Sequence, residues 1–233
     1  SLRARIKANH SATHLMHEAL RRVLGEHVQQ KGSLVDADKM RFDFSHTQSL
    51  SADELSRVSQ LVNEQIRHNS EVLTQEMEMD AAIEAGATAL FGEKYGDAVR
   101  VLTMGSERFS VELCGGTHVA RTGDIGVFRI LNESGVAAGV RRIEAVTGIG
   151  ALSDIAKVDK VVADICDVVK SSPENAADKV ISLRVEVREL EKQITQLKQK
   201  LATGAGADLT SEAVDVMGFK VLGTVVEGAD AST

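Results

Sequence analysis

Two short histidine-containing motifs are the features of this sequence best suited to chemistry. The first, HSATH, places His10 and His14 four residues apart, and the second, CGGTH, does the same for Cys114 and His118. On a helix, residues i and i+4 share a face, so both imidazoles of the first motif can reach one point. The two glycines of the second motif allow a tight loop that brings its thiol and imidazole together.

Together the motifs supply three imidazoles and one thiolate, a donor set that suits zinc. We therefore predict a zinc site formed by His10, His14, Cys114 and His118, although either motif alone is a weak signal. The first motif is not the HExxH of metalloproteases, because Ser11 stands where that motif has its catalytic Glu. Peptide hydrolysis is therefore disfavoured.

The number of ligands leaves two kinds of zinc site open. Four protein ligands are typical of a closed, structural zinc, whereas a catalytic zinc keeps one position open for water or substrate. With an open position, zinc could activate water or polarise an ester carbonyl. The sequence alone supports both interpretations.

The elements expected around the motifs indicate an α+β fold over residues 1–150, with strands of a mixed or antiparallel sheet and no regular βαβ alternation. The HSATH motif lies on the first expected helix, and CGGTH follows directly after an expected strand. We expect helices near residues 3–24, 51–66 and 80–87, and strands near 33–35, 40–44, 71–79, 99–104, 109–113, 126–132 and 140–147.

Residues 151–201 are predicted to form a helical arm. Apolar residues from Ala176 to Leu201 alternate in steps of four and three, which is a heptad seam. We expect this helix to form an antiparallel hairpin with the helix at 151–170, or to make a coiled-coil contact that allows self-association. Cys166 lies on an apolar stripe of that preceding helix, so we expect it to be buried.

Residues 202–233 are predicted to be a linker followed by the truncated start of a C-terminal domain. The segment ATGAGAD at 202–208 is expected to be flexible, and two strands are expected at 213–216 and 219–226. Two strands with no partner helix do not make a stable domain. We therefore expect the chain to be a fragment of a longer protein.

The composition bounds the class of protein. The 233 residues are 43% hydrophobic and 26% charged, which is ordinary for a globular protein. A formal net charge of −7 argues against strong nonspecific binding to nucleic acid. No apolar run is long enough to cross a membrane and no signal peptide is visible, so no membrane partner is expected. Two cysteines cannot form a disulfide framework, which favours a reducing, cytoplasmic location.

Five segments, in this order, closely resemble the editing domain of the bacterial alanyl-tRNA synthetase family. They are NHSATHL at 9–15, QKGS at 30–33, RFDF at 41–44, CGGTH at 114–118 and GVRRIEAVTG at 139–148. The resemblance is strong over residues 1–150, and the rest resembles the linker and the start of the C-terminal domain of these enzymes. The related threonyl-tRNA synthetase editing domain also carries both metal motifs, but RRIEAVTG and the heptad seam favour the alanyl family.

The resemblance implies hydrolysis of the 3′ aminoacyl ester of tRNA(Ala) that carries Ser or Gly. The metal ligands of the family map onto the four residues already named. The resemblance also implies two catalytic candidates, Cys114 and Gln30. Gln30 matches a family position near the ester. Thr13 is a candidate for reading the seryl hydroxyl; the alternative is a helix hydroxyl bonded to its own backbone. Gly32 and Arg142 are candidate substrate contacts, although Arg142 is equally typical of a solvated strand.

The family's full enzyme also has an aminoacylation core that uses ATP and Mg²⁺, and no ATP-binding signature is present here. This chain is therefore not expected to charge tRNA. Three other functions stay open. They are a free-standing deacylase that acts in trans, a non-catalytic zinc-stabilised module for tRNA binding or association, and a threonyl counterpart that acts on tRNA(Thr).

Overall fold

The computed structural model describes residues 1–88, 98–209 and 213–221. The chain divides into two compact units, Ser1–Val158 and Asp159–Thr233. Each unit is described by itself below.

Two long helices of the first unit begin and end at residues that favour helix boundaries. Helix α1 (Leu2–Leu24) stops at Gly25, whose φ of 118° is costly for other residues. Helix α2 (Ala52–His68) begins with a capping box, in which Ser51 and Glu54 each bond the other's backbone N–H. Both helices match the sequence prediction. The first carries the HSATH motif.

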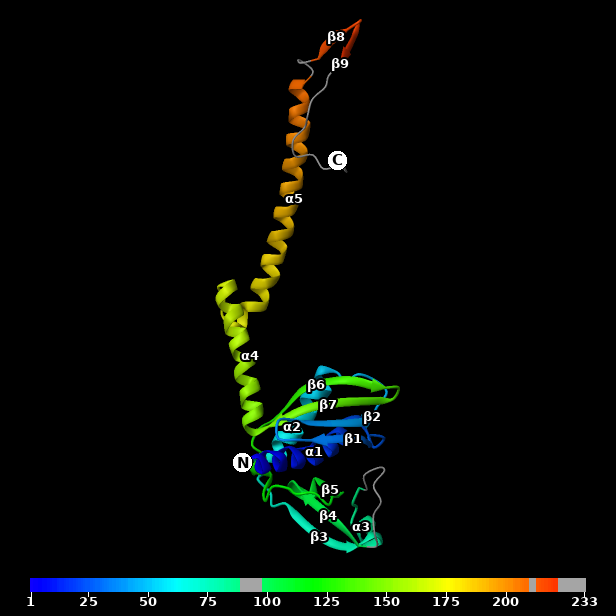
Figure 1. Ribbon diagram of the computed structural model, residues 1–233. Helices are drawn as coiled ribbons and strands as arrows, with labels where there is room; N and C mark the ends of the chain where they lie inside the picture. Colours follow the sequence, from blue (N-terminus) through cyan, green and yellow to red (C-terminus); the bar gives the residue numbers. More distant parts are fainter. Residues whose placement is uncertain (89–97, 210–212, 222–233) are drawn as a thin grey trace. The chain divides into compact units, whose positions relative to one another are not determined.

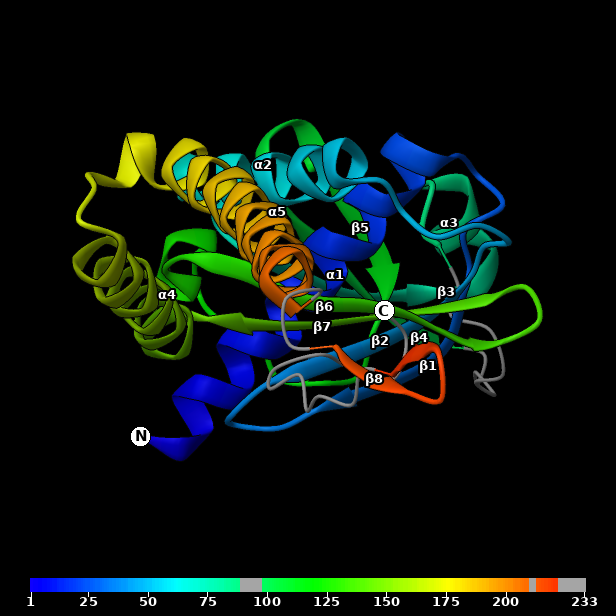
Figure 2. The ribbon, with the colours of Figure 1, turned by 90° about the horizontal axis from the view of Figure 1, so that it is seen from above.

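A four-stranded antiparallel sheet lies against α1 (Figures 1 and 2). Its order is β1-β2-β7-β6, with β1 at Gln30–Val35, β2 at Met40–Ser45, β6 at Phe128–Ala137 and β7 at Val140–Thr147. Phe42 and Ile143 are paired across β2 and β7, and both are fully buried. Successive side chains alternate between the faces of a sheet, so Asp43 and its partner Arg142 lie on the opposite face.

A second, three-stranded antiparallel sheet completes the first unit. It runs β3-β4-β5, formed by Leu73–Glu78, Ala98–Met104 and Ser110–Leu113, with the short helix α3 (Met79–Glu84) after β3. Short 3-10 helices occupy Ser106–Arg108 and Thr122–Ile125.

Helix α1 contacts both sheets. The Thr13 hydroxyl lies 3.1 Å from the sulfur of Met40 on β2, and His14 contacts Glu112 on β5. The helix with the first motif is therefore held beside the strand that leads into the second motif.

The predicted α+β class is confirmed, with mixed helix and antiparallel sheet in the first unit and long helices after it. The main difference in boundaries is β6, which extends to Ala137, beyond the expected end at Asn132. The residues Asn-Glu-Ser-Gly are typical of turns. Here they pair with β7 along a hairpin that turns at Gly139, whose φ is 72°. Cross-strand pairing outweighs the local preference for a turn.

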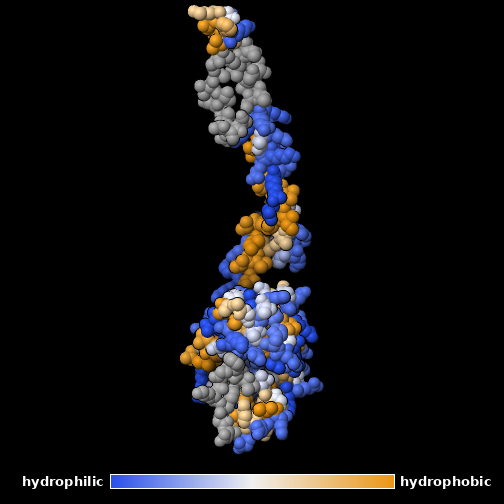
Figure 3. Space-filling model, turned by 90° about the vertical axis from the view of Figure 1, so that its right-hand side faces the viewer, coloured by the Kyte–Doolittle hydropathy of each residue, from blue (hydrophilic) through white to orange (hydrophobic). Residues whose placement is uncertain are grey.

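The second unit is built on two helices. It contains the end of α4 (Gly148–Val169), a 3-10 turn at Pro173–Asn175, α5 (Ala176–Leu209) and the hairpin of β8 (Val214–Val216) and β9 (Phe219–Val221). Cys166 on α4 is buried, as predicted. The heptad seam of α5 is largely exposed, from 39% at Val180 to 74% at Leu201, and Figure 3 shows apolar side chains along these helices.

The predicted flexible linker at 202–208 is wrong, because α5 continues to Leu209. The segment contains three alanines, which are the best helix formers, and extending an existing helix requires no new nucleus. The predicted strand at 219–226 is confirmed for Phe219–Val221, and its remainder lies outside the described residues. No helix in the described ranges is long and apolar enough to cross a membrane.

Candidate metal centre

The four predicted ligands meet at one point between α1 and the loop after β5. One ligand atom from each of His10, His14, Cys114 and His118 lies within 4.8 Å of the others. The Cys114 sulfur is 3.6 Å from Nε2 of His10 and 3.4 Å from Nε2 of His118. The group offers three nitrogens and one sulfur, which is compatible with zinc.

The local backbone explains why the two motifs converge. His10 and His14 are one helical turn apart on α1, with ring centroids separated by 5.2 Å. At Gly116 the loop runs so close to α1 that an added Cβ would lie 2.8 Å from Nδ1 of His10. An added Cβ at Gly115 would meet nothing within 4 Å. Close approach of the loop to the helix therefore requires glycine at only one of the two positions.

An arginine on β4 holds the same loop from the other side. The Arg100 guanidinium donates to the carbonyl oxygens of Gly115 and Gly116, at 3.1 and 2.7 Å. In addition, the Cys114 N–H donates to the Arg100 carbonyl at 3.0 Å. The loop is thus fixed to the strand through both its backbone and an arginine side chain.

Neighbouring side chains orient two of the imidazoles. Nδ1 of His14 donates to the Glu112 carboxylate at 2.5 Å, and Nδ1 of His118 lies 3.2 Å from the Ser11 hydroxyl. In both rings the other nitrogen faces the cluster. Nε2 of His14 is buried and has no hydrogen-bond partner among the described residues. A bound metal would satisfy this nitrogen, so the residues present fit a zinc ion.

The ionisation of the cluster also suits metal binding. Burial opposes ionisation of the Cys114 thiol, but the hydrogen bonds with His10 and His118 and the nearby charge of His14 outweigh burial and lower its pKa to about 3. Burial likewise opposes a proton on His14, but the negative charges of Glu112 and Cys114 and the hydrogen bond to Glu112 together outweigh it and raise the His14 pKa to about 10. Cys114 is therefore a thiolate, the form that binds metals, and a metal ion would displace the His14 proton.

Thr13 lies on α1, the helix with the first motif, and its hydroxyl makes a hydrogen bond within the protein. It donates to the Asn9 carbonyl at 2.9 Å, the bond expected for a helix hydroxyl that bonds its own backbone. Its predicted role in reading the seryl hydroxyl stays a prediction.

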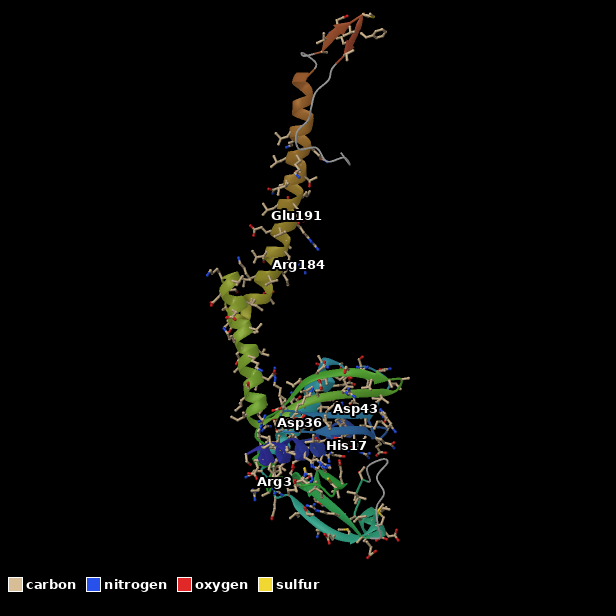
Figure 4. The ribbon with its side chains drawn as sticks, in the orientation of Figure 1. Arg3, His17, Asp36, Asp43, Arg184 and Glu191 are labelled. Carbon is tan, nitrogen blue, oxygen red and sulfur yellow. The ribbon has the colours of Figure 1, made fainter. Side chains whose placement is uncertain are left out.

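The other three candidates lie on the four-stranded sheet. Gly32 and Arg142 both pair with Asp43, labelled in Figure 4, on the face turned away from α1. Arg142 makes a two-pronged ion pair with Asp43, at 2.7 and 2.8 Å. Gln30 pairs with Phe44 at the start of β1. Among the described hydrogen bonds, none joins these three residues to the metal ligands, and their substrate roles stay predictions.

Sequence reasoning missed Glu112, Arg100 and the orienting role of Ser11. One signal was available for Glu112. It stands between Val111 and Leu113 on an otherwise apolar strand, two residues before Cys114, so strand alternation places both side chains on one face.

Comparison with known proteins shows what the chain resembles. The domain described as "Threonyl and Alanyl tRNA synthetase second additional domain" matches residues 99–144, which include the second motif. An alanine–tRNA ligase of Pseudomonas syringae pv. syringae is 56% identical over 96% of this chain. Those of Saccharophagus degradans and Ralstonia nicotianae are 57% and 53% identical over 97% and 99% of it.

The chain is homologous to a segment of the alanine–tRNA ligases. It spans about a quarter of the length of these relatives, since the match covers 26% of each. The second additional domain supplies Cys114 and His118, whereas His10 and His14 precede it. Two of the four candidate ligands therefore lie inside the matched domain, and the other two lie before its first residue.

Proposed function

We propose that residues 1–150 are the editing domain of an alanine–tRNA ligase, which hydrolyses the ester of tRNA(Ala) mischarged with serine or glycine. One observation carries the proposal: three histidines and a cysteine converge in a chain homologous to these ligases. Residues 151–201 would then be a helical arm, and 202–233 would hold the start of a C-terminal domain. The complete enzyme would attach alanine with ATP and Mg²⁺ in a core outside this chain, in the cytoplasm.

The physics of amino-acid selection explains why such an enzyme needs a second site. One missing methyl group is worth only about 1–3 kcal/mol, so a pocket for alanine cannot exclude glycine strongly. A small pocket also rejects serine poorly, because serine merely adds a hydroxyl group. A separate hydrolytic site that acts on the wrong products restores accuracy.

The burial of the ligands defines the side from which an ester could approach. His14 and Cys114 are buried, whereas His10 and His118 are partly exposed. Bound zinc would supply Lewis-acid chemistry, polarising the ester carbonyl or activating water. His14 and Cys114 would anchor the ion from the protein side, while the exposed edge between His10 and His118 would receive the 3′ end of the tRNA.

We keep four further residues as proposed substrate contacts: Gln30 beside the ester, Thr13 for the seryl hydroxyl, and Gly32 and Arg142 for the tRNA end. We also propose that the exposed heptad seam of α5 allows self-association as a coiled coil. Kinetic measurements can distinguish a substrate contact from a metal ligand. A substrate-binding residue raises KM when changed, whereas loss of a metal ligand removes hydrolysis altogether.

Hydrolysis of Ser-tRNA(Ala) compared with Ala-tRNA(Ala), with zinc content measured in the same samples, tests the proposal. We expect the chain to cleave the seryl ester selectively and Cys114→Ala to lose that activity. Cys166→Ala is the matched control, since it changes the other buried cysteine, in the second unit, and is expected to keep full activity. Equal hydrolysis by Cys114→Ala and the unchanged chain would refute the role of the cluster.

The presence of four protein ligands supports a second candidate, a non-catalytic module in which zinc is structural. In that case zinc removal would unfold the chain, and no tRNA ester would be cleaved at any zinc content. A threonyl counterpart would instead act on tRNA(Thr), so a charged tRNA(Thr) sample belongs in the same assay. Activity by this chain as strong as that of a complete ligase would favour a free-standing deacylase.

A further inference from the structure

A buried carboxylate lies directly behind the proposed metal centre. Glu112 on β5 is 3% exposed. Its Oε2 accepts a hydrogen bond from Nδ1 of His14 at 2.5 Å, and its Oε1 accepts one from Nδ1 of His17 at 3.0 Å. His14 and His17 are three residues apart on α1, so one helix face presents two donors to one carboxylate. Figure 4 shows His17 on this helix.

The carboxylate determines which nitrogen of His14 can bind a metal. An imidazole that donates through Nδ1 keeps the lone pair of Nε2 free. Nε2 of His14 is the atom that is buried without a partner. Rotation or the other tautomer would break the 2.5 Å bond and leave a buried carboxylate oxygen unpaired, which is costly. Glu112 therefore fixes the orientation of His14 in which Nε2 faces the metal position, and the ring binds a metal once the proton on Nε2 is displaced.

The charges of the same group also balance. A buried charge is costly unless it is compensated. The Cys114 thiolate and the Glu112 carboxylate together carry two negative charges, which would match the charge of a divalent cation. Without Glu112, a zinc ion bound to one thiolate and three imidazoles would leave one uncompensated positive charge.

We propose that Glu112 is a positioning residue of the metal centre, which fixes His14 in the tautomer that binds zinc, and that His17 holds the second oxygen of Glu112. The inference rests on the proposed metal centre. It assigns to Glu112 and His17 roles that are separate from binding the metal directly, since neither belongs to the group of four ligands.

The alternative is that Glu112 only ties α1 to β5. Both roles predict that changing Glu112 alters stability, so stability alone cannot separate them. A positioning role also predicts a change in zinc affinity in a protein that is still folded. Changing the residue that orients a metal-bound histidine typically costs about 10–100-fold in affinity.

The test is a zinc titration of the full chain against a chromophoric chelator, with circular dichroism on the same samples. Glu112→Gln keeps the size of the side chain but removes its charge and one accepting oxygen, and we expect about 10–100-fold weaker zinc binding. His17→Gln can still donate an N–H to the carboxylate and is expected to bind zinc like the unchanged chain. Val111→Ala is the control for disturbing β5, because alternation places the Val111 side chain on the opposite face of that strand from Glu112.

The outcomes separate this inference from the proposed function. Equal zinc affinity in folded Glu112→Gln and the unchanged chain would overturn the inference and leave the metal centre standing. Failure of the unchanged chain to bind zinc would overturn both. A loss in Val111→Ala as large as that in Glu112→Gln would assign the effect to strand packing and overturn the positioning role.

A measurement on the unchanged chain covers the case in which Glu112→Gln does not fold. Long-range ¹H–¹⁵N NMR spectra of the zinc-loaded protein report which nitrogen of each histidine carries the proton. We expect His14 to be protonated at Nδ1 and metal-bound at Nε2. A zinc-bound Nδ1 in His14 would overturn the inference.

Discussion

Gly116→Ala is the change that most sharply tests how the loop meets the metal-bearing helix. The added methyl group would sit 2.8 Å from Nδ1 of His10. Ordinary contacts of this kind begin near 3.4 Å. The ring or the loop must therefore move by at least about 0.6 Å, whereas metal–ligand distances tolerate only about 0.2 Å. The displacement exceeds the tolerance at least threefold, because Cε1 of the same ring lies even closer to the added methyl group than Nδ1 does.

The expected result is loss of His10 as a ligand with the fold preserved. The backbone of Gly116 is not in the left-handed region, so alanine brings no conformational strain there. Gly115→Ala is the matched control, since its added methyl group meets nothing within 4 Å. We expect zinc affinity to fall by at least about tenfold in Gly116→Ala, the lower limit for disturbing the surroundings of a ligand. Gly115→Ala should bind zinc normally.

Both variants can be assayed by zinc titration against a chelator and by hydrolysis of Ser-tRNA(Ala). Equal zinc affinity in the two alanine variants would refute the reasoning, because it would mean that the contact between Gly116 and His10 places no constraint on the site. Unfolding of Gly116→Ala alone would be visible by circular dichroism and would show that the contact supports the fold as well.

Four other predictions follow from particular contacts. Arg100→Ala removes two hydrogen bonds to the loop, each worth about 0.5–1.5 kcal/mol net. Zinc affinity should therefore fall by up to about a hundredfold. An unchanged affinity would show that the loop keeps its shape without Arg100. Asp43→Ala leaves the Arg142 guanidinium without its partner, and denaturant unfolding should show a lower free energy of unfolding. Zinc affinity should stay unchanged, since the pair lies on the far face of the sheet. Backbone N–H groups of Lys39 and Asp38 lower the pKa of Asp36 from 3.8, so its stabilising effect is present above that pH and disappears as the pH falls through the lowered pKa. The Tm difference between the unchanged chain and Asp36→Asn should therefore shrink as the pH falls below 3.8, and a constant difference would contradict this. Removing zinc with a chelator should lower the unfolding free energy by about 2.7 kcal/mol relative to a sample at a hundred times the zinc Kd, and identical melting curves would argue against a bound ion.

The sequence predicted the ligand group because each motif depends on local geometry. A helix brings His10 and His14 to one face, and glycines allow a tight loop between Cys114 and His118. The strand Val140–Thr147 and the helix start at Ser51 were predictable for the same reason, since alternation and capping are properties of neighbouring residues.

Features that depend on distant contacts could not be predicted in this way. Alternation within a strand places Arg141 and Arg142 on opposite faces of the sheet, but it does not reveal which face lies against α1. The structure pairs Arg141 with Glu133, and Arg142 with Asp43. The position of Glu112 beside His14 and His17 depends on how β5 packs on α1, and no pattern within either element encodes that contact.

In the helices after residue 148, sequence patterns were clear but did not determine the structure. The heptad seam of α5 is regular, but a seam does not identify the surface that covers it, and its side chains are largely exposed in this chain. Glycines at 204 and 206 suggested a linker, yet the helix continues to Leu209 because the neighbouring alanines favour helix.

The most direct test of the central claim is X-ray absorption at the zinc edge on the zinc-loaded chain. The cluster predicts one zinc per chain, with nitrogen neighbours at about 2.0–2.1 Å and one sulfur neighbour at about 2.3 Å. The sulfur neighbour should vanish in Cys114→Ala and persist in Cys166→Ala. A zinc surrounded only by oxygen and nitrogen in the unchanged chain, or a sulfur signal that survives in Cys114→Ala, would contradict the assignment of the metal centre.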